Sequence, residues 1–466
     1  MNRLALLVVG AGPAGIFAAL RSGLPPEQVL IVDEGREVEA RLGARRFGLD
    51  VPGTIATGFG GAGLFSNGQL CLTHQIGSTI AHRFPAAEVN RRQHAIDAIL
   101  HDGMDIGELR PIGPAAGIAA TARRHGLSYL QYAVRQLDSD QLIRMTTRLR
   151  DRILHTARLS CETACVAIEP TGGGWLVRLE GKLNGVFEAA NVVLAPGKAG
   201  AGWLRETGTA LGLSREAAAP RLGVRLQGPA GFLSALLAGS GDPRLTWSVG
   251  DGVRVRLQNL SDGDVVPATS QGLIVVGGTS ARAAGFERSS GTVMVTSGLC
   301  AADVRRIVAG VNDASRDGVL TQSLPEFLAG GGGLDEHYPA RLTELLRRFV
   351  LRLANVCPEV LHPSTVVHGP AVEGLTDRFD VTDELEARGR PGLYLAGDGP
   401  GLTGGIIGAA DSGWLAGASI ARRSGRTAAR PRTRRPVPGV RTGPAAAPAR
   451  DAGRPSDGVT VVPPAG

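Results

Sequence analysis

A glycine-rich turn directly behind a short apolar run constrains this chain more than any other feature. The run Leu4–Val9 holds six apolar residues, and the turn Gly10-Ala-Gly12-Pro-Ala-Gly15 leads into a small-residue helix expected over Ala14–Arg21. A continuous apolar run is typical of a strand buried on both faces of a parallel sheet. Since Val29–Val32 reads as the next strand, the first 35 residues predict a β-turn-α-β unit and an α/β fold.

The spacing within this turn predicts a dinucleotide. Gly10 permits a tight turn, Gly12 lets the backbone approach a pyrophosphate, and Gly15 lets helix and strand pack closely. An acidic residue at the end of the second strand can accept ribose hydroxyls, and Asp33 or the adjacent Glu34 stands there. A glycine turn that binds nothing is the alternative. The predicted contacts are Gly10, Gly12, Pro13, Ala14, Gly15, Asp33 and Glu34.

A late glycine-rich loop indicates which dinucleotide is bound. The strand expected over Leu393–Ala396 ends in Gly397-Asp398, and Gly404-Gly405-Ile406 then opens a helix that runs to Arg422. Asp398 can hydrogen-bond a ribityl or pyrophosphate-adjacent hydroxyl. The amides that open the helix can stabilise the negative charge of a reduced flavin. Together with the N-terminal turn, this loop predicts FAD.

Three stretches also carry a resemblance to a known family. They are GAGPAG at 10–15, GFGGAGLFSNGQL at 58–70 and YLAGDGPGLTGGIIGAADSG at 394–413. The chain resembles the FAD-dependent dehydrogenases of the glutathione-reductase-type flavoprotein superfamily, in particular a group described only as uncharacterised. The resemblance implies that Val166 meets the adenine through its backbone. It also implies that the segment Gly61 to Gly68, with Gly63 and Ser66, lies along the flavin, and that Pro196-Gly197 stands where such proteins have an Ala-Thr-Gly turn.

The chain departs from that family at two places. Asn67 and Gln69 stand where the family's second loop has an acid and a lysine, and residues 256–263 replace a cysteine-rich stretch. Chemistry that relies on those thiols or on that lysine therefore cannot be transferred. The departures leave FAD binding intact as an expectation, but they leave the substrate and the reaction undetermined.

The candidates for catalysis are weak. Cys71 follows the second glycine-rich loop directly, so its thiol could work against the flavin, and His74 could act as a base. An ordinary buried or surface role is the alternative for both. No Cys-x-x-Cys accompanies Cys71, and Cys161 and Cys165 lack a matched second pair, so we expect no disulfide chemistry and no metal site. Residues 75–128 carry no chemical motif.

The chain divides by pattern into four parts. We expect a discontinuous Rossmann-like FAD-binding domain over 1–75, 130–220 and 356–423, with a mostly helical insertion at 76–129. Residues 221–355 should form a β-rich α+β substrate domain. The Arg/Pro/Ala-rich stretch 424–466 has almost no large apolar residues and is expected to be disordered.

The distribution of charge and the number of cysteines limit which partners and which cellular compartment the sequence favours. The net charge is +7, but ten of the 50 basic and two of the 43 acidic residues lie between Arg422 and Gly466, so the body is close to neutral. A neutral body does not favour nucleic-acid binding. Five scattered cysteines suit a reducing compartment, and no apolar stretch is long enough to span a membrane. We expect a cytoplasmic protein that binds a small-molecule substrate.

These features predict an FAD-dependent oxidoreductase, a dehydrogenase that moves a hydride between a small organic substrate and bound FAD, with bacterial secondary metabolism as its setting. No second nucleotide fingerprint is present, so a dedicated NAD(P)H domain is not expected. Two alternatives stay open: a flavin-dependent monooxygenase or reductase that uses external NAD(P)H, and an FAD-binding protein without catalysis. The electron donor or acceptor and the oligomeric state do not follow from the sequence.

Overall fold

The computed structural model describes residues 3–46, 56–66, 68–107, 109–110, 113, 115–237, 241–278 and 287–425. The chain divides into two units, Met1–Pro431 and Arg432–Gly466, and all described residues belong to the first. Apart from Ser424 and Gly425, the tail predicted over 424–466 lies outside the described residues, as does Asn67.

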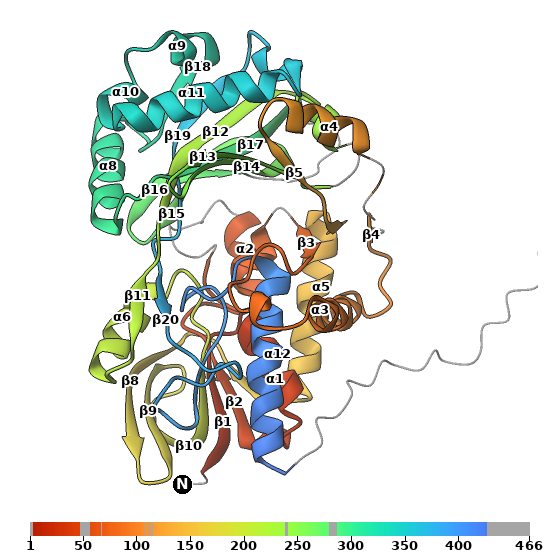
Figure 1. The fold of residues 1–466 in the computed structure, drawn as a ribbon. Coiled ribbons are helices and arrows are strands. Elements are labelled where there is room, and N and C mark those ends of the chain that lie inside the picture. The colour runs from red at the N-terminus through yellow and green to blue at the C-terminus, as the bar shows by residue number, and fades with distance from the viewer. Residues whose placement is uncertain are drawn as a thin grey trace, which may run out of the picture. The chain divides into compact units, whose positions relative to one another are not determined.

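The N-terminal pattern folds into a seven-stranded sheet (Figure 1). Its strands in spatial order are β7 (Arg158–Ser160), β2 (Val29–Val32), β1 (Leu4–Val9), β10 (Gly185–Leu194), β9 (Gly174–Gly181) and β8 (Thr163–Thr171), and β21 (Leu393–Leu395) pairs with β10. Strands β7, β2, β1, β10 and β21 run parallel to one another, whereas β9 runs antiparallel to both of its neighbours, β10 and β8. The predicted α/β class, with a parallel Rossmann-like core, is confirmed.

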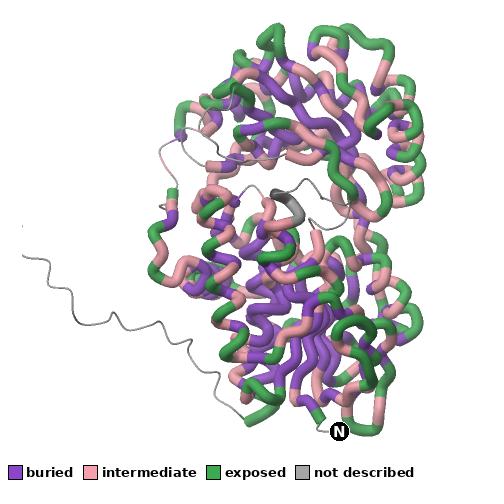
Figure 2. The backbone as a smooth tube through the Cα atoms, turned by 180° about the vertical axis from the view of Figure 1, so that it is seen from behind, coloured by how far each residue is buried: buried purple, intermediate pink, exposed green. Residues whose placement is uncertain are grey.

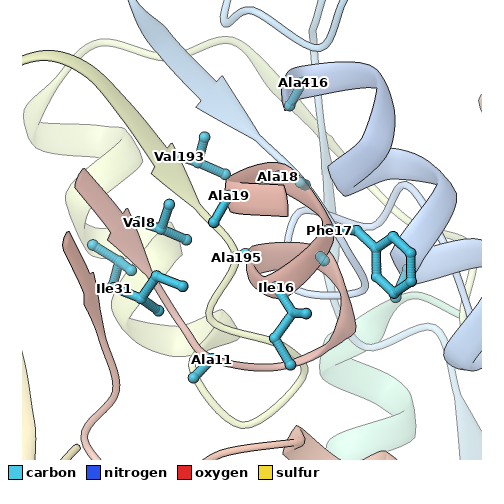
Figure 3. Packing of buried hydrophobic residues seen from close by; sticks show 14 of the residues in the cluster. Val8, Ala11, Ile16, Phe17, Ala18, Ala19, Ile31, Val193, Ala195 and Ala416 are labelled. Carbon is cyan, nitrogen blue, oxygen red and sulfur yellow. The ribbon is translucent and has the colours of Figure 1, made fainter. Parts of the chain in front are cut away.

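Two helices of small residues pack together beside this sheet. Ile16 and Ala19 of α1 (Pro13–Ser22) lie over the strand residues Val8, Ile31 and Val193, all fully buried (Figure 3). On its other side α1 packs against α12 (Gly405–Arg423). A β-carbon at Gly413 or Gly417 of α12 would lie 1.9 Å and 2.4 Å from the carbonyl oxygens of Ala14 and Ala18. Glycine at these two positions is therefore what lets the helices approach.

A second sheet of seven strands is entirely antiparallel. Its strands in spatial order are β18 (Leu320–Ser323), β19 (Val366–Glu373), β12 (Arg221–Pro229), β17 (Arg288–Thr296), β14 (Val253–Asp262), β13 (Arg244–Gly250) and β5 (Ser128–Leu130). The alternation along β12 gives the sheet two different faces, because successive side chains point to opposite sides. Leu222, Val224 and Leu226 join the core under α8 (Ala301–Ala314) and α11 (Ala340–Ala354), and Arg221, Arg225 and Gln227 alternate with them.

Smaller elements complete the unit. The remaining strands are β3 (Gln69–Leu72), β6 (Ala133–Gln136) and β4 (Leu109–Arg110) in one sheet, β11 (Arg215–Ala217) with β20 (Asp377–Phe379), and β15 (Val265–Ser270) with β16 (Leu273–Gly278). The remaining α-helices are α2 (Val38–Arg46), α3 (Ala86–His101), α4 (Ala116–Arg124), α5 (Ser139–Leu154), α6 (Ala201–Ala210), α7 (Ser234–Leu237), α9 (Leu324–Ala329) and α10 (Leu334–His337). Buried backbone concentrates in the strands of both large sheets and in α12 (Figure 2).

The strands divide the chain differently from the sequence pattern at three places. Residues 185–194 form one strand, β10, although the apolar stretches at 186–190 and 192–195 read as two separate strands. Strand β5, which spans the predicted boundary between the insertion at 76–129 and the segment 130–220, pairs with β13 of the second sheet. Strand β19, inside the segment predicted to belong to the first domain, pairs with β12 of the second. Hydrogen bonding to strands distant in sequence decides each case, and local pattern does not carry that information.

In the part of the chain that the structure describes, no helix combines the length and the apolar character that crossing a membrane requires.

Candidate cofactor and substrate site

The first glycine-rich turn connects β1 to α1, as the spacing predicts. Gly10 has a φ of +106°, and a β-carbon there would lie 2.1 Å from the carbonyl oxygen of Ala195, which follows β10. Gly10 also donates its N–H to the carbonyl oxygen of Val32 over 2.7 Å. A β-carbon at Gly15 would lie 1.9 Å from the carbonyl oxygen of Gly10. The fold itself therefore requires glycine at both positions.

Gly12 differs from its neighbours in the same turn. Its φ of −78° and ψ of 179° are extended backbone that any residue adopts, and it is the N-cap of α1. Among the described residues, a β-carbon there would meet only the Cα of Gly61, at an ordinary 3.8 Å. Pro13 follows at the first helical position, and no side chain caps the helix. The protein's own packing does not explain a glycine at position 12.

The carboxylate of Asp33, at the end of β2, accepts hydrogen bonds from three different segments of backbone. Its Oδ2 accepts the N–H of Ala11 over 2.8 Å, and its Oδ1 accepts those of Gly35 and Gly58 over 2.9 and 2.8 Å. Because each carboxylate oxygen has two acceptor positions, Oδ2 retains one. Glu34 beside it is exposed, and no hydrogen bond or ion pair joins its carboxylate to another described residue.

The second glycine-rich loop lies against the first. Gly60 donates its N–H to the carbonyl oxygen of Ala11 over 2.9 Å, and a β-carbon at Gly61 would lie 3.2 Å from the Cα of Gly12. The loop continues as a 3₁₀ helix over Gly61–Phe65, which Ser66 ends by donating its hydroxyl to the carbonyl oxygen of Gly63 over 2.9 Å. Gly63 in turn faces Ile406, whose Cγ1 lies 3.2 Å from a β-carbon built there.

A buried arginine that the sequence reading missed supports this loop. Arg41 of α2 is only 2% exposed and donates to the carbonyl oxygens of Phe59 and Gly61 over 2.5 and 3.0 Å. Its guanidinium also lies 4.9 Å from the ring of Phe65. An arginine among the charged residues of a short helix gives no sequence signal of such a role.

The third glycine-rich loop lies against the start of α1, beside the first two loops. A β-carbon at Gly397, which has a φ of +84°, would lie 3.1 Å from the Cβ of Ala14. The carboxylate of Asp398 accepts the hydroxyl of Thr403 over 2.8 Å and the N–H of Gly405, and it lies 3.7 Å from the Nζ of Lys198. Burial raises the pKa of Asp398 above its usual value, against the effect of Lys198. Gly404 is the N-cap of α12, and no side chain caps that helix.

Two further predicted contacts lie at the rim of this arrangement. Val166 is 42% exposed and stands at a bulge in β8, because Cys165 pairs with Leu179 and Ala167 with Arg178 of β9. Its backbone is therefore left out of the ladder. Gly197 has a φ of +63° in the turn after β10, and its carbonyl oxygen lies against Gly399.

A cavity of about 930 Å³ lies beyond Ile406, between the second and third loops and the polar face of the second sheet. On one side the cavity is lined by residues 75–79, which follow the second loop and β3, and by Asp398 and residues 401–408 of the third loop and the start of α12. From the sheet it is lined by Arg221, Arg225, Arg244 and Glu373 among others. The sequence showed no chemical motif in residues 75–128, and the structure places residues 75–79 at the wall of this cavity. The N–H of Gly404 donates to the carbonyl oxygen of Gly77 over 2.5 Å and holds the segment there.

The two candidates for catalysis are placed differently. Cys71 of β3 lines the cavity, and burial raises the pKa of its thiol, with nearby Asp242 acting in the same direction and Arg244 against it. A thiol held protonated is a poor nucleophile. His74 does not line the cavity. Within the described ranges, no three His, Cys, Asp or Glu side chains gather as they would around a metal ion.

Comparisons with known proteins identify no family. No protein-family description and no curated protein sequence matches the chain. Among solved structures it is similar to glycine oxidase from Geobacillus kaustophilus, at a TM-score of 0.42 and 16% identity over 91% of this chain and 95% of that one. It is similar to L-amino acid deaminase from Proteus myxofaciens, at a TM-score of 0.37 and 16% identity over 92% of each chain.

A third similar structure is aklavinone-11 hydroxylase in complex with FAD and aklavinone, at a TM-score of 0.38 and 15% identity over 91% of this chain and 63% of that one.

Proposed function

We propose that this chain binds FAD and is an FAD-dependent oxidoreductase that transfers a hydride between a small organic substrate and the bound FAD. The observation that carries the proposal is the convergence of three glycine-rich loops, far apart in sequence, around Gly12. Gly61 lies against Gly12, Gly63 against Ile406, and Gly397 against Ala14. The part built on the first sheet would hold the cofactor, and the second sheet would cover the substrate.

The glycine at position 12 shows whether the first loop suits a pyrophosphate. Because its backbone is extended and a β-carbon would meet no close atom of the described residues, their packing does not require glycine at this position. A pyrophosphate does need it, since the phosphates must approach the backbone closely at the start of α1. The uncapped N-terminus of that helix supplies the N–H groups and partial positive charge that phosphates favour.

Residues suited to an adenosine lie on the same side of the sheet. The free acceptor position on Asp33 and the exposed carboxylate of Glu34 can accept ribose hydroxyls. Val166 follows residues 160–163, which hydrogen-bond to Asp33 and Gly35, so its unpaired backbone lies on the strand beside them. An adenine edge needs one N–H and one acceptor from such a backbone.

The opposite end would hold the flavin ring. Gly61, Gly63, Ser66 and Ile406 would lie along it, and the N–H groups that open α12 would face it across the third loop. FAD, when bound, would supply the site at which a hydride is accepted or donated. The two sheets would exclude water from the cavity, and the N-terminus of α12 would favour negative charge near it. The raised pKa of the Cys71 thiol keeps that side chain neutral.

The Gly12→Val substitution tests the proposal. The variant should fold, because position 12 adopts a backbone that valine prefers, but it should purify without the stoichiometric FAD of the wild-type chain. Gly202→Val is the matched control, since Gly202 of α6 also has open space around its β-carbon position but lies outside the three loops. Equal FAD content in Gly12→Val and wild type would refute the proposed site.

A further inference from the structure

The sheet face that borders the cavity carries more cationic side chains than it can pair. Among the described residues, five cations line the cavity: Lys198, Arg221, Arg225, Arg244 and Arg378. Three of them have carboxylate partners. Lys198 pairs with Asp398 at 3.7 Å, Arg221 with Glu373 at 2.8 Å, and Arg378 with Glu216. Within the described residues, no carboxylate lies at ion-pair distance from Arg225 or Arg244.

Arg225 is a buried guanidinium held by neutral groups. The residue is 6% exposed, and its nitrogens donate to the hydroxyls of Ser290, Thr292 and Ser261 over 3.0, 3.0 and 2.7 Å. Burial lowers its pKa to about 10. Gly278 passes so close that a β-carbon there would lie 2.2 Å from the Nη2 of Arg225. The surroundings thus fix the orientation of the guanidinium without neutralising its charge.

Arg244 is less constrained. Its Nε is buried without a hydrogen-bond partner, and no carboxylate or carbonyl within the described residues accepts from its terminal nitrogens. The nearest buried acid, Asp242, is already engaged: it accepts the hydroxyl of Tyr132 over 2.7 Å and the N–H of Leu260 over 3.0 Å. Burial raises the pKa of Asp242, against the effects of its two hydrogen bonds and of the nearby Arg244 and Arg225, but its carboxylate forms no ion pair with either guanidinium.

Two guanidinium groups in such a place favour an anion that enters the cavity. A buried charge without a partner is costly, and a bidentate carboxylate is the partner whose geometry matches guanidinium best. The pyrophosphate of the proposed cofactor does not fill this role, because Gly12 and the N-terminus of α1 do not line the cavity. A volume of about 930 Å³ is large enough for a flavin ring and a small molecule beside it.

We propose that this cavity binds a small organic acid as substrate, with its carboxylate held by Arg225 and Arg244. As a statement about substrate, the inference rests on the proposed function. As a statement about an anion site, it stands on the two arginines alone. Arg225 provides the fixed, oriented part of the site, and Arg244 provides a guanidinium whose donors are free to form new hydrogen bonds.

The test uses three probes on the purified full chain: benzoate, its uncharged counterpart benzamide, and inorganic phosphate. Binding is measured by the change in the flavin absorption spectrum and, independently of any flavin, by the rise in melting temperature. Benzoate should bind and benzamide should not. Arg244→Gln should weaken benzoate binding about tenfold or more, because it removes a charge-assisted hydrogen bond. Arg244→Lys, which keeps the charge, should recover part of the loss.

Arg244→Gln is the primary variant because no hydrogen bond joins the Arg244 side chain to another described residue, whereas Arg225→Gln removes the hydrogen bonds to three hydroxyls and with them part of what holds the sheet. Arg378→Gln is the control, since Arg378 also lines the cavity but is paired and exposed; its affinity for benzoate should stay within about twofold of wild type.

The outcomes separate the two proposals. If FAD is bound but benzoate and benzamide bind alike, or if Arg244→Gln has no effect on benzoate, the organic-acid inference is wrong while the proposed function stands. If phosphate binds better than benzoate, the site is an anion site of another kind and the inference is also wrong. If no FAD is bound but benzoate still raises the melting temperature through Arg244, the proposed function fails and the anion site remains.

Discussion

At the scale of single residues, the most informative side chain is Asp33, which the sequence reading assigned to a ribose. In the structure Asp33 also stabilises the loops around it, because its carboxylate accepts N–H groups from the first glycine-rich turn, from Gly35 and from the second loop. The sequence could predict an acid at the end of this strand. It could not predict the amides of Gly35 and Gly58, because those hydrogen bonds depend on where the later loop lies.

Asp33→Ala should destabilise the protein even without a cofactor. Three N–H groups lose a charged acceptor, which we expect to cost about 2–4 kcal/mol in the free energy of unfolding. Glu34→Gln should leave the free energy of unfolding within about 0.5 kcal/mol of wild type, because Glu34 is exposed. If Glu34 accepts a ribose hydroxyl, its variant should nevertheless lower FAD affinity. Urea unfolding of both apo-proteins, with FAD titration, measures these effects; equal stability of the two variants would contradict the role given to Asp33.

His368 of β19 should make stability depend on pH. Burial, together with Arg225 and Arg288, lowers its pKa from 6.5 to about 4, so the folded protein favours the neutral ring. The unfolded chain then binds more protons between these values. The stabilisation is therefore present above about pH 6.5 and is lost as the pH falls toward about 4.

His368→Gln should flatten this pH dependence by up to about 2 kcal/mol between pH 7 and 4.5. The exposed His362 provides the control variant His362→Gln. The free energy of urea unfolding at the two pH values is the measurement. A pH dependence in His368→Gln as steep as in wild type would show that another group is responsible.

At the scale of elements, the contact of α1 with α12 sets where the first and third loops meet. The sequence predicts both helices and their small residues, but nothing local indicates that Gly413 and Gly417 face the carbonyl oxygens of Ala14 and Ala18. The same limit applies to β5 and β19, whose partners in the second sheet are far away in sequence.

Gly413→Ala should be strongly destabilising, because its β-carbon would lie 1.9 Å from the carbonyl oxygen of Ala14 and the helices would have to separate. We expect a loss of about 3 kcal/mol or more and a parallel loss of FAD affinity, since Gly12 and Gly404 move apart. Gly117→Ala in α4, where nothing lies within 4 Å, should instead stabilise the protein by about 0.5–1 kcal/mol. If Gly413→Ala unfolds at the same denaturant concentration as wild type, the close helix contact is not real.

At the scale of the whole molecule, the cavity depends on residues that no single motif contains. The glycine-rich turns can be located from the sequence because several of their positions, among them Gly10, Gly397 and Gly405, adopt a positive φ that favours glycine. The sequence did not predict Arg225 or Arg244, although arginines alternating with apolar residues in Arg221-Leu-Gly-Val-Arg-Leu could have indicated a charged face of a strand. Only the folded sheet shows which side of that strand meets the third loop.

Removal of residues 426–466 should leave the FAD content and the melting temperature of the remaining chain unchanged. The composition of this stretch is the reason, because it has almost no large apolar residues before Val459 and cannot bury enough surface to stabilise the rest. Differential scanning fluorimetry of the shortened and full chains makes the comparison. A fall of several degrees in the shortened chain would show that the stretch contributes to folding.

Titration of the wild-type apo-protein with FAD shows whether the three glycine-rich loops form one FAD site. Quenching of flavin fluorescence should saturate at one FAD per chain, and FMN, which lacks the adenosine expected beside Glu34 and Val166, should bind far more weakly. Saturation at no defined ratio, or equal affinity for FMN and FAD, would contradict the claim.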